Sequence, residues 1–346
     1  MTRLPLFLMT AALTLAAPLA QAQQPVAWRN GYILNSDAGM LQMSEKGGFA
    51  AAQGIAIETV NLRGDPLLLK SLLSGQLESY IGGPASPMVA ASKGADVKIV
   101  GCGWHKQSYI LWGGPGVKDV KDLRGKTIGI STPGSAPDIF IRAAMATEGV
   151  SANEVKFVAA GMPSDWLKSM SAGVIDAAAT PDEYSVRGQA MGLKVMTTSD
   201  KATPMSMQRC YYTTGATLKQ HPERVAKFLA AEMAAYTFAL KNRDETIKLA
   251  RRLVSAPADA PEPAAAYDSV VSRNVIETSF EPPMEKLRWL RDVLAENKLL
   301  DRAWDPEAMI DRRPLLEARK IFAAAGTKAE EAAPAALAAS GGGALR

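Results

Sequence analysis

The sequence predicts an α/β protein of two lobes, each a mixed, mostly parallel sheet flanked by helices, joined by a hinge of two chain crossings. Short apolar strands alternate with amphipathic helices from residue 26 onward, which indicates parallel sheets covered on both faces. A loop rich in Gly and Pro at 113–116 divides this alternation into two series. The two series resemble each other in pattern, which predicts two lobes of similar construction.

The first series lies between residues 26 and 100. Gly54 and Gly75 each follow a predicted helix, in the position where glycine commonly ends one. We expect strands at 26–28, 55–60, 77–81 and 97–100, with helices at 39–52, 66–73 and from about 85 to 91.

The second series follows the loop and repeats this pattern. In both series a helix-ending glycine precedes an apolar–acidic pair, a short buried strand and a polar turn containing proline, at 74–86 and again at 172–182. We expect strands at 127–130, 155–158, 175–178 and 194–196, with helices at 138–147, 163–171 and 183–191.

Two apolar, aromatic segments, 109–112 and 209–213, bracket the second series, and we interpret them as the two crossings. Lobe 1 is then discontinuous, 23–111 and 210–326, and lobe 2 is 112–209. Helices are expected from 217 onward, including a long one that begins at Pro222, and others at 243–254 and 283–294. The Ala/Gly/Glu-rich segment 327–346 lacks periodicity and is predicted to be a disordered tail.

The N-terminal segment has the pattern of a secretory signal peptide. Arg3 precedes an apolar run at 4–19, and Ala20-Gln21-Ala22 forms a small-residue cleavage site. Two prolines interrupt the run, which is too short for a good membrane-spanning helix. We therefore expect residues 1–22 to be a signal peptide cleaved after Ala22, and the mature protein to be exported and periplasmic.

The net charge of +4 over 346 residues is mild, and no basic stripe interleaved with aromatic residues suggests nucleic-acid binding. Two cysteines, Cys102 and Cys210, are too far apart in sequence for a CxxC motif. An oxidising compartment permits a disulfide between them. Two buried free cysteines are the favoured interpretation, with the disulfide left open.

Polar turns lie where strands end and helices begin, two in each predicted lobe. In open α/β sheets ligands bind at such places, because helix N-termini present free N–H groups and partial positive charge. Simple helix capping is the alternative for each turn. The predicted ligand-binding residues in these turns are Asn35, Ser36, Asp37, Ala85, Ser86, Ser131, Thr132, Gly134, Ser135, Asp182 and Tyr184.

Histidine is scarce, and this argues against several enzyme classes. His221 is expected to lie at a helix start. His105 follows a predicted strand and could face the cleft beside Trp104, so His105 and Trp104 are also predicted to bind the ligand. An exposed loop histidine is the alternative. The sequence has no P-loop, no dinucleotide fingerprint and no G-x-S-x-G elbow, and its His and Cys residues do not cluster. No catalytic residue, cofactor or metal is predicted.

Several stretches together resemble a known family. The chain from 26 to about 300 resembles the periplasmic substrate-binding proteins of ABC importers that handle sulfonates, taurine, nitrate and thiamine-precursor pyrimidines. The resemblance is carried by 41–49 (LQMSEKGGF), 72–78 (LLSGQLE), 122–129 (DLRGKTIG) and 221–223 (HPE), in that order. Relatives that make the thiamine pyrimidine carry a cysteine-rich iron motif, which this sequence lacks.

The resemblance implies the type II periplasmic binding protein fold and a monomeric receptor that delivers a small molecule to an ABC permease in the inner membrane. A small organic anion such as a sulfonate is the expected ligand, because Asp182 and Glu183 would repel a simple inorganic anion. Two alternatives stay open: an enzyme in thiamine-pyrimidine or cofactor chemistry on the same scaffold, and a ligand-sensing subunit for a partner other than a permease.

Overall fold

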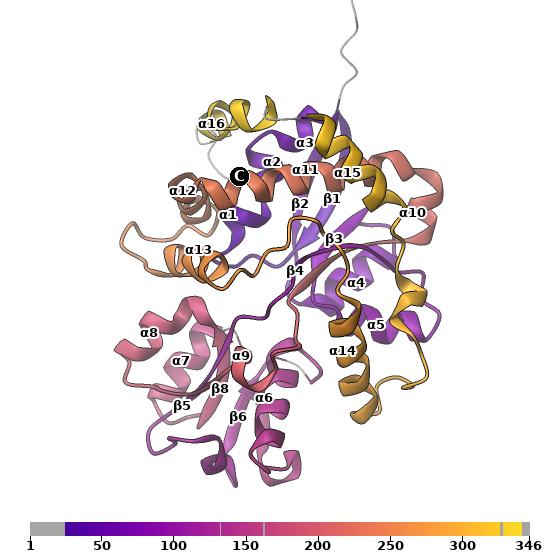
Figure 1. The fold of residues 1–346 in the computed structure, drawn as a ribbon. Coiled ribbons are helices and arrows are strands. Elements are labelled where there is room, and N and C mark those ends of the chain that lie inside the picture. The colour runs from indigo at the N-terminus through magenta and orange to yellow at the C-terminus, as the bar shows by residue number, and fades with distance from the viewer. Residues whose placement is uncertain (1–24, 132, 162, 326–327, 341–346) are drawn as a thin grey trace, which may run out of the picture.

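The computed structural model describes residues 25–131, 133–161, 163–325 and 328–340, and its two lobes lie one above the other in Figure 1. The predicted signal peptide, 1–22, lies outside the described residues. Each lobe contains a five-stranded mixed sheet with helices on both faces. This confirms the predicted fold class.

The first sheet has the strand order β2-β1-β3-β10-β4. Strands β1, β2 and β3 are parallel, and β10 is antiparallel to both of its neighbours, β3 and β4. The strands are β1 (Val26–Tyr32), β2 (Ile55–Asn61), β3 (Ser79–Gly82), β4 (Lys98–Trp104) and β10 (Arg209–Thr213).

The second sheet repeats this topology, in the order β7-β6-β8-β5-β9. Strands β6, β7 and β8 are parallel, and β5 is antiparallel to β8 and β9. The strands are β5 (Tyr109–Gly113), β6 (Thr127–Ile130), β7 (Lys156–Ala159), β8 (Ala177–Pro181) and β9 (Lys194–Thr198). In both sheets the antiparallel strand is the first one that the chain forms after changing lobes, which explains why the two lobes share one strand order.

The helices cover the two faces of each sheet, so that each lobe has three layers (Figure 1). In lobe 1 they are α1 (Ala38–Leu41), α2 (Met43–Lys46), α3 (Phe49–Ala52), α4 (Asp65–Leu73), α5 (Ala85–Ser92), α10 (Gly215–Gln220), α11 (Pro222–Lys241), α12 (Arg243–Leu253), α13 (Glu262–Ser272), α14 (Met284–Glu296), α15 (Arg313–Ala325) and α16 (Lys328–Ser340). In lobe 2 they are α6 (Ala136–Thr147), α7 (Pro163–Ser171), α8 (Ser185–Ala190) and α9 (Ser199–Ala202), with 3₁₀ turns that include η3 (Asp182–Tyr184).

Apolar side chains alternate between the two faces of each strand, as the pleat of a sheet requires. In β10, Tyr211 faces one core cluster, with Trp104 and Phe228, while Tyr212 faces the other, with Ile99 and Leu287. Two further clusters lie on the two faces of the second sheet. Four buried clusters therefore give each lobe a core on both sides of its sheet.

Three features differ from the sequence-based expectations. The helix expected at 39–52 is three short helices. The first break is at Gln42, whose φ of -104° and ψ of 7° are not helical, and the second is at Gly48, whose φ is 77°. Segments 109–112 and 209–213, interpreted above as the crossings, are paired within the two sheets as β5 and β10, so the chain crosses between the lobes at 105–108 and 203–208. Part of the expected disordered tail forms α16, whose Ala333 and Leu337, one turn apart, are buried in the lobe 1 core.

Cys102 on β4 and Cys210 on β10 form a disulfide. This corrects the favoured expectation of two free thiols. The strands β4 and β10 are antiparallel neighbours, and they flank the two crossings between the lobes. The disulfide therefore joins the points at which the chain leaves lobe 1 and returns to it, after 108 residues.

We expect the double variant Cys102→Ala/Cys210→Ala to lose about 3–5 kcal/mol in free energy of unfolding, because the disulfide closes a long loop in the unfolded chain. Urea denaturation of the variant and of the wild type, with and without reductant, measures the loss. Reductant should destabilise the wild type and leave the variant unchanged. An equal stability of oxidised and reduced wild type would contradict this expectation.

Candidate ligand-binding cleft

A cavity of about 460 Å³ lies between the two lobes. Its walls come from the carboxyl ends of six parallel strands, β1, β2 and β3 in lobe 1 and β6, β7 and β8 in lobe 2. The two crossings and α14 complete it. The lining residues include Ile33, Asn35, Arg63–Leu67, Gly83–Ser86, Gln107, Tyr109, Ser131, Pro133–Pro137, Ile139, Gly161, Trp166, Pro181, Ser206, Met207, Trp289 and Leu290. This is the place where open α/β sheets bind ligands.

Three helices begin at the cavity: α4 and α5 in lobe 1, and α6 in lobe 2. Their N-cap residues are Gly64, Pro84 and Ser135, and none of the three makes a side-chain capping hydrogen bond. Carboxylates do stand in the first turns of two of these helices: Asp65 in α4, and Asp138 in α6, whose Oδ2 accepts a hydrogen bond from the Gly134 N–H at 2.7 Å. The backbone N–H groups that remain free at the three helix starts still carry partial positive charge. Helix ends from both lobes favour an anionic group in the space between them.

Two charged side chains line the cavity, Arg63 and Asp65. Asp65 accepts a hydrogen bond from the backbone N–H of Gly83 through Oδ1 at 2.9 Å. Burial raises the pKa of Asp65, an effect that this hydrogen bond and the nearby Arg209 oppose. Arg63 is exposed and has no ion-pair partner among the described residues. Arg63 is thus the cation that lobe 1 presents to the cavity.

Six of the predicted ligand-binding residues line this cavity. They are Asn35, Ala85, Ser86, Ser131, Gly134 and Ser135. The hydroxyls of Ser131 and Ser135 are hydrogen-bonded to each other at 3.0 Å. Thr132 lies outside the described residues.

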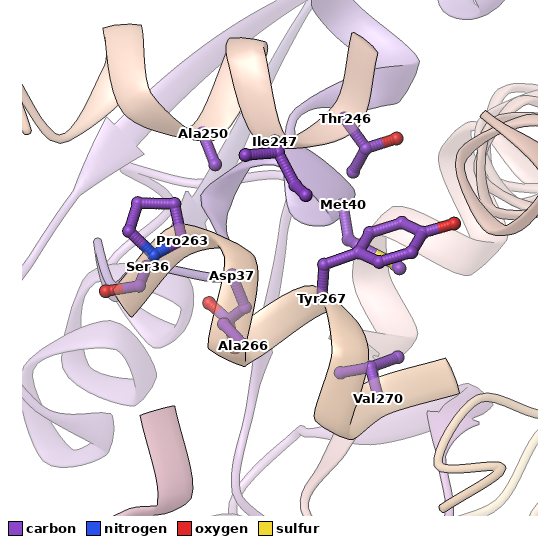
Figure 2. Close-up of a pocket in the computed structure, with 11 residues that line it drawn as sticks. Ser36, Asp37, Met40, Thr246, Ile247, Ala250, Pro263, Ala266, Tyr267 and Val270 are labelled. Carbon is purple, nitrogen blue, oxygen red and sulfur yellow. The ribbon is translucent and has the colours of Figure 1, made fainter. Parts of the chain in front are cut away.

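Ser36 and Asp37 do not line the cavity. They lie at a narrow gap of about 10 Å³ between α1, α12 and α13, which Figure 2 shows in close-up. Asp37 Oδ2 instead accepts a hydrogen bond from Arg209 at 2.6 Å, in an ion pair that is buried on both sides. A buried guanidinium requires such a partner, so Asp37 has a structural partner and lies outside the cavity lining, while its contact with a ligand stays a prediction.

Trp104 and His105 also lie away from the cavity. Trp104 is in the lobe 1 core, 1% exposed, where its Nε1–H donates to the Tyr236 hydroxyl at 2.9 Å. His105 Nε2 lies 2.8 Å from the carbonyl oxygen of Cys102, and burial lowers the pKa of the ring. Both side chains are held by partners within lobe 1.

Asp182 and Tyr184 belong to contacts outside the cavity. Asp182 in lobe 2 forms an ion pair with Arg273, just after α13 of lobe 1, at 2.9 Å. Tyr184 is half-buried against the core of lobe 2. Of the predicted turn at 180–184, it is Pro181 that lines the cavity.

Sequence reasoning missed several lining residues. Arg63 follows β2 and Asp65 begins α4, so the rule that polar residues between a strand end and a helix start face the ligand would also have found them. Trp166 lies on α7, after β7, and the same rule applies to it. Trp289 is on α14, far along the chain, and no local pattern indicates that α14 reaches the cleft.

The two lobes contact each other on two sides of the cavity. On one side, Arg273 binds both Asp182 and Asp200, and Arg187 of α8 binds Glu262 of α13 at 2.5 Å. On the other side, Ile139 of α6 packs against the lobe 1 cluster that contains Leu290 of α14. The structure is therefore a closed arrangement in which the lobes are held together around the cavity.

Glu183 is the buried acid of this lobe–lobe contact. Its Oε1 accepts a weak hydrogen bond from the Ser36 N–H at 3.4 Å. Burial, with the negative charge of Asp37, raises the pKa of Glu183 to about 8 from an ordinary 4.5. Burial in this contact therefore favours the protonated form of the Glu183 carboxyl.

A family model described as "NMT1/THI5 like" matches residues 35–246, more than half of the chain. The chain belongs to this family. No curated protein sequence matches it.

Solved structures share the fold of this NMT1/THI5-like protein. The alkanesulfonate-binding protein SsuA from Xanthomonas axonopodis pv. citri, bound to MOPS, is 18% identical with a TM-score of 0.67, covering 84% of this chain and 100% of its own. The aliphatic sulphonate binding protein SsuA from Escherichia coli is 20% identical with a TM-score of 0.67, covering 84% and 93%. The nitrate-binding protein NrtA from Synechocystis PCC 6803 is 13% identical with a TM-score of 0.69, covering 90% and 91%. These likenesses confirm the predicted periplasmic binding protein fold.

Neither a membrane-spanning helix nor a cluster of metal ligands is present among the described residues. No helix in that part of the chain is long and apolar enough to span a bilayer. No group of three or more His, Cys, Asp or Glu side chains there is arranged to hold a metal ion.

We expect the stability of the wild type to fall as the pH rises from about 4.5 to 8. Folded Glu183 keeps its proton through this window, whereas the unfolded chain has lost it, so unfolding becomes more favourable with rising pH. Glu183→Gln, which resembles the protonated form, should remove about 2–4 kcal/mol of this decline. Urea denaturation at pH 5, 7 and 9 measures it.

The exposed Glu223 of α11 supplies the matched control, because Glu223→Gln should keep the decline of the wild type. Identical pH profiles for the wild type and Glu183→Gln would show that Glu183 is not protonated in the closed form.

Proposed function

We propose that this protein is an exported solute-binding receptor. It holds a small organic anion in the cavity between its lobes and delivers it to an ABC permease of the inner membrane. The mature protein acts in the periplasm as a monomer, after cleavage behind Ala22.

The geometry of the cavity is the main support for this proposal. Helix N-termini without side-chain caps come from both lobes, and Arg63 adds a formal positive charge. An anion is therefore contacted from both sides only when the lobes are closed. Such contacts couple binding to closure, because a ligand shifts the equilibrium toward the state that it binds more tightly.

The comparisons and the cysteines point in the same direction. Two of the similar structures are sulfonate-binding proteins and one is nitrate-binding, by their own descriptions. The disulfide between Cys102 and Cys210 fits an oxidising compartment outside the cytoplasm. His105, the residue on which the enzyme alternative depends, is held by the Cys102 carbonyl and does not line the cavity.

We expect an anionic ligand to raise the thermal midpoint, because a ligand at a hundred times its Kd stabilises the folded state by about 2.7 kcal/mol. Ser86→Asp places a carboxylate at the start of α5, where it repels an anion. This variant should weaken anion binding at least tenfold. Calorimetric titration and thermal melts with a panel of sulfonates, carboxylates and nitrate measure both effects.

Ser92→Asp is the matched control, because Ser92 is at the opposite end of α5 and does not line the cavity. It should bind the panel as the wild type does. If no anion raises the midpoint of the wild type, or if Ser86→Asp binds anions unchanged, the receptor proposal fails.

A further inference from the structure

We propose that the ligand is an aromatic acid, a planar apolar ring that carries one oxyanion group, and that Trp166 and Arg63 recognise that group. This inference rests on the proposed function and names the ligand class within it. It is carried by three properties of the cavity: its aromatic walls, its size and two donors, the Trp166 Nε1–H and Arg63, for which the described residues supply no hydrogen-bond acceptor or ion-pair partner.

Aromatic side chains line the cavity from both lobes. Trp166 comes from α7 of lobe 2, and Trp289 comes from α14 of lobe 1. Tyr109 stands at the start of β5, where it stacks on Phe140 with ring centroids 6.1 Å apart. Aromatic rings interact with one another in stacked and edge-to-face arrangements, so three rings around one space favour a planar aromatic occupant.

Most of the remaining wall is apolar. Side chains that present only carbon or sulfur to the cavity include Ile33, Leu67, Ile139, Met207 and Leu290, and five prolines also line it. A small hydrophilic anion would leave these surfaces in contact with trapped water. Burying an apolar ring against them removes that surface from water, which is favourable in proportion to the area covered.

The size of the cavity agrees with an organic body. Its 460 Å³ is within the range of pockets that enclose drug-sized ligands, about 300–1,000 Å³. At about 30 Å³ per water molecule, it has room for roughly fifteen waters. A nitrate or sulfate ion, with only three or four oxygen atoms, would fill a small part of it.

The polar groups call for a hydrogen-bond acceptor that carries negative charge. Trp166 is 2% exposed, and its Nε1–H has no acceptor among the described residues. An indole N–H can only donate, so its missing partner is an acceptor. Arg63, without an ion-pair partner in the described chain, is a second donor. Asp65 is committed to the Gly83 N–H through one of its oxygens.

A ligand that has only an apolar ring, or only a negative charge, leaves some of the side chains that line the cavity without a partner. A neutral hydrocarbon ring would fill the walls and leave Trp166 Nε1 and Arg63 unpaired. A short aliphatic anion would pair those donors and leave the rings of Trp289 and Tyr109 uncovered. An aromatic acid satisfies both groups of side chains at once.

Calorimetric titration of the wild-type protein with matched compounds tests the ligand class. Benzenesulfonate is compared with ethanesulfonate, and benzoate with propionate, while benzamide supplies the uncharged ring. We expect each aromatic acid to bind at least tenfold more tightly than its aliphatic partner, and benzamide to bind at least tenfold more weakly than benzoate. Ethanesulfonate and propionate binding as tightly as the aromatic acids would overturn the inference while leaving the receptor proposal intact. If none of the five compounds binds, both fall.

Conservative variants test the two recognition residues. Trp166→Phe keeps a ring and removes the N–H, and it should weaken benzoate at least fivefold while changing benzamide less. Arg63→Met should weaken benzenesulfonate at least tenfold. Trp304→Phe and Arg224→Met, whose side chains do not line the cavity, are the matched controls and should bind as the wild type does.

A folding defect in these variants is separated from a binding defect by the thermal midpoint of the unliganded protein. Trp289→Leu, which removes a ring and no ligand-facing charge, gives a second measure of the aromatic wall. This variant should reduce the difference in affinity between benzenesulfonate and ethanesulfonate. Unchanged affinities in folded Trp166→Phe and Arg63→Met would overturn the assignment of these two residues.

Discussion

The buried ion pair between Arg209 and Asp37 is the interaction on which the arrangement of the cleft depends. Arg209 begins β10, where the chain returns to lobe 1, and its guanidinium lies 4.5 Å from the centre of the Trp104 ring. One side chain thus joins the turn after β1, the end of β4 and the start of β10. A guanidinium buried without a carboxylate partner is strongly destabilising, so these three elements must stay together. Both crossings between the lobes connect to these elements, the first at the end of β4 and the second at the start of β10.

The same interaction explains why two residues that the sequence suggested as ligand contacts have structural roles. Asp37 follows a strand and precedes a helix, as a ligand-binding residue of this fold would. Its charge is nevertheless paired with Arg209, which is distant in sequence. The two residues become neighbours only when β10 joins the sheet of lobe 1. Trp104 is likewise held between Arg209 and the Tyr236 hydroxyl. A local sequence pattern predicts where a residue lies relative to strands and helices, but it does not predict which distant residue its side chain contacts.

Local patterns were sufficient for most of the fold. Alternating apolar runs and helix-ending glycines predicted the parallel strands and the two similar lobes, because these features depend on neighbours within a few residues. The antiparallel strands β5 and β10, the disulfide and α16 depend on contacts across long stretches of chain. In the cleft, the strand-end rule found the turns at 85–86 and 131–135. It could not find Trp289, since α14 reaches the cavity only through tertiary packing against lobe 1.

The balance of charge across the cleft connects ligand binding to closure. In the closed arrangement, the N-termini of α4 and α5 face that of α6 across one cavity, and like partial charges oppose each other. Ion pairs such as Arg187–Glu262 and Arg273–Asp182 hold the lobes together. Glu262 is buried, whereas the other three side chains are partly exposed, so water screens part of the attraction. Burial of Glu183 beside Asp37 opposes closure further when that carboxyl is ionised. A negatively charged ligand between the lobes is attracted by the helix N-termini on both sides. The closed state is therefore stabilised most when it encloses an anion.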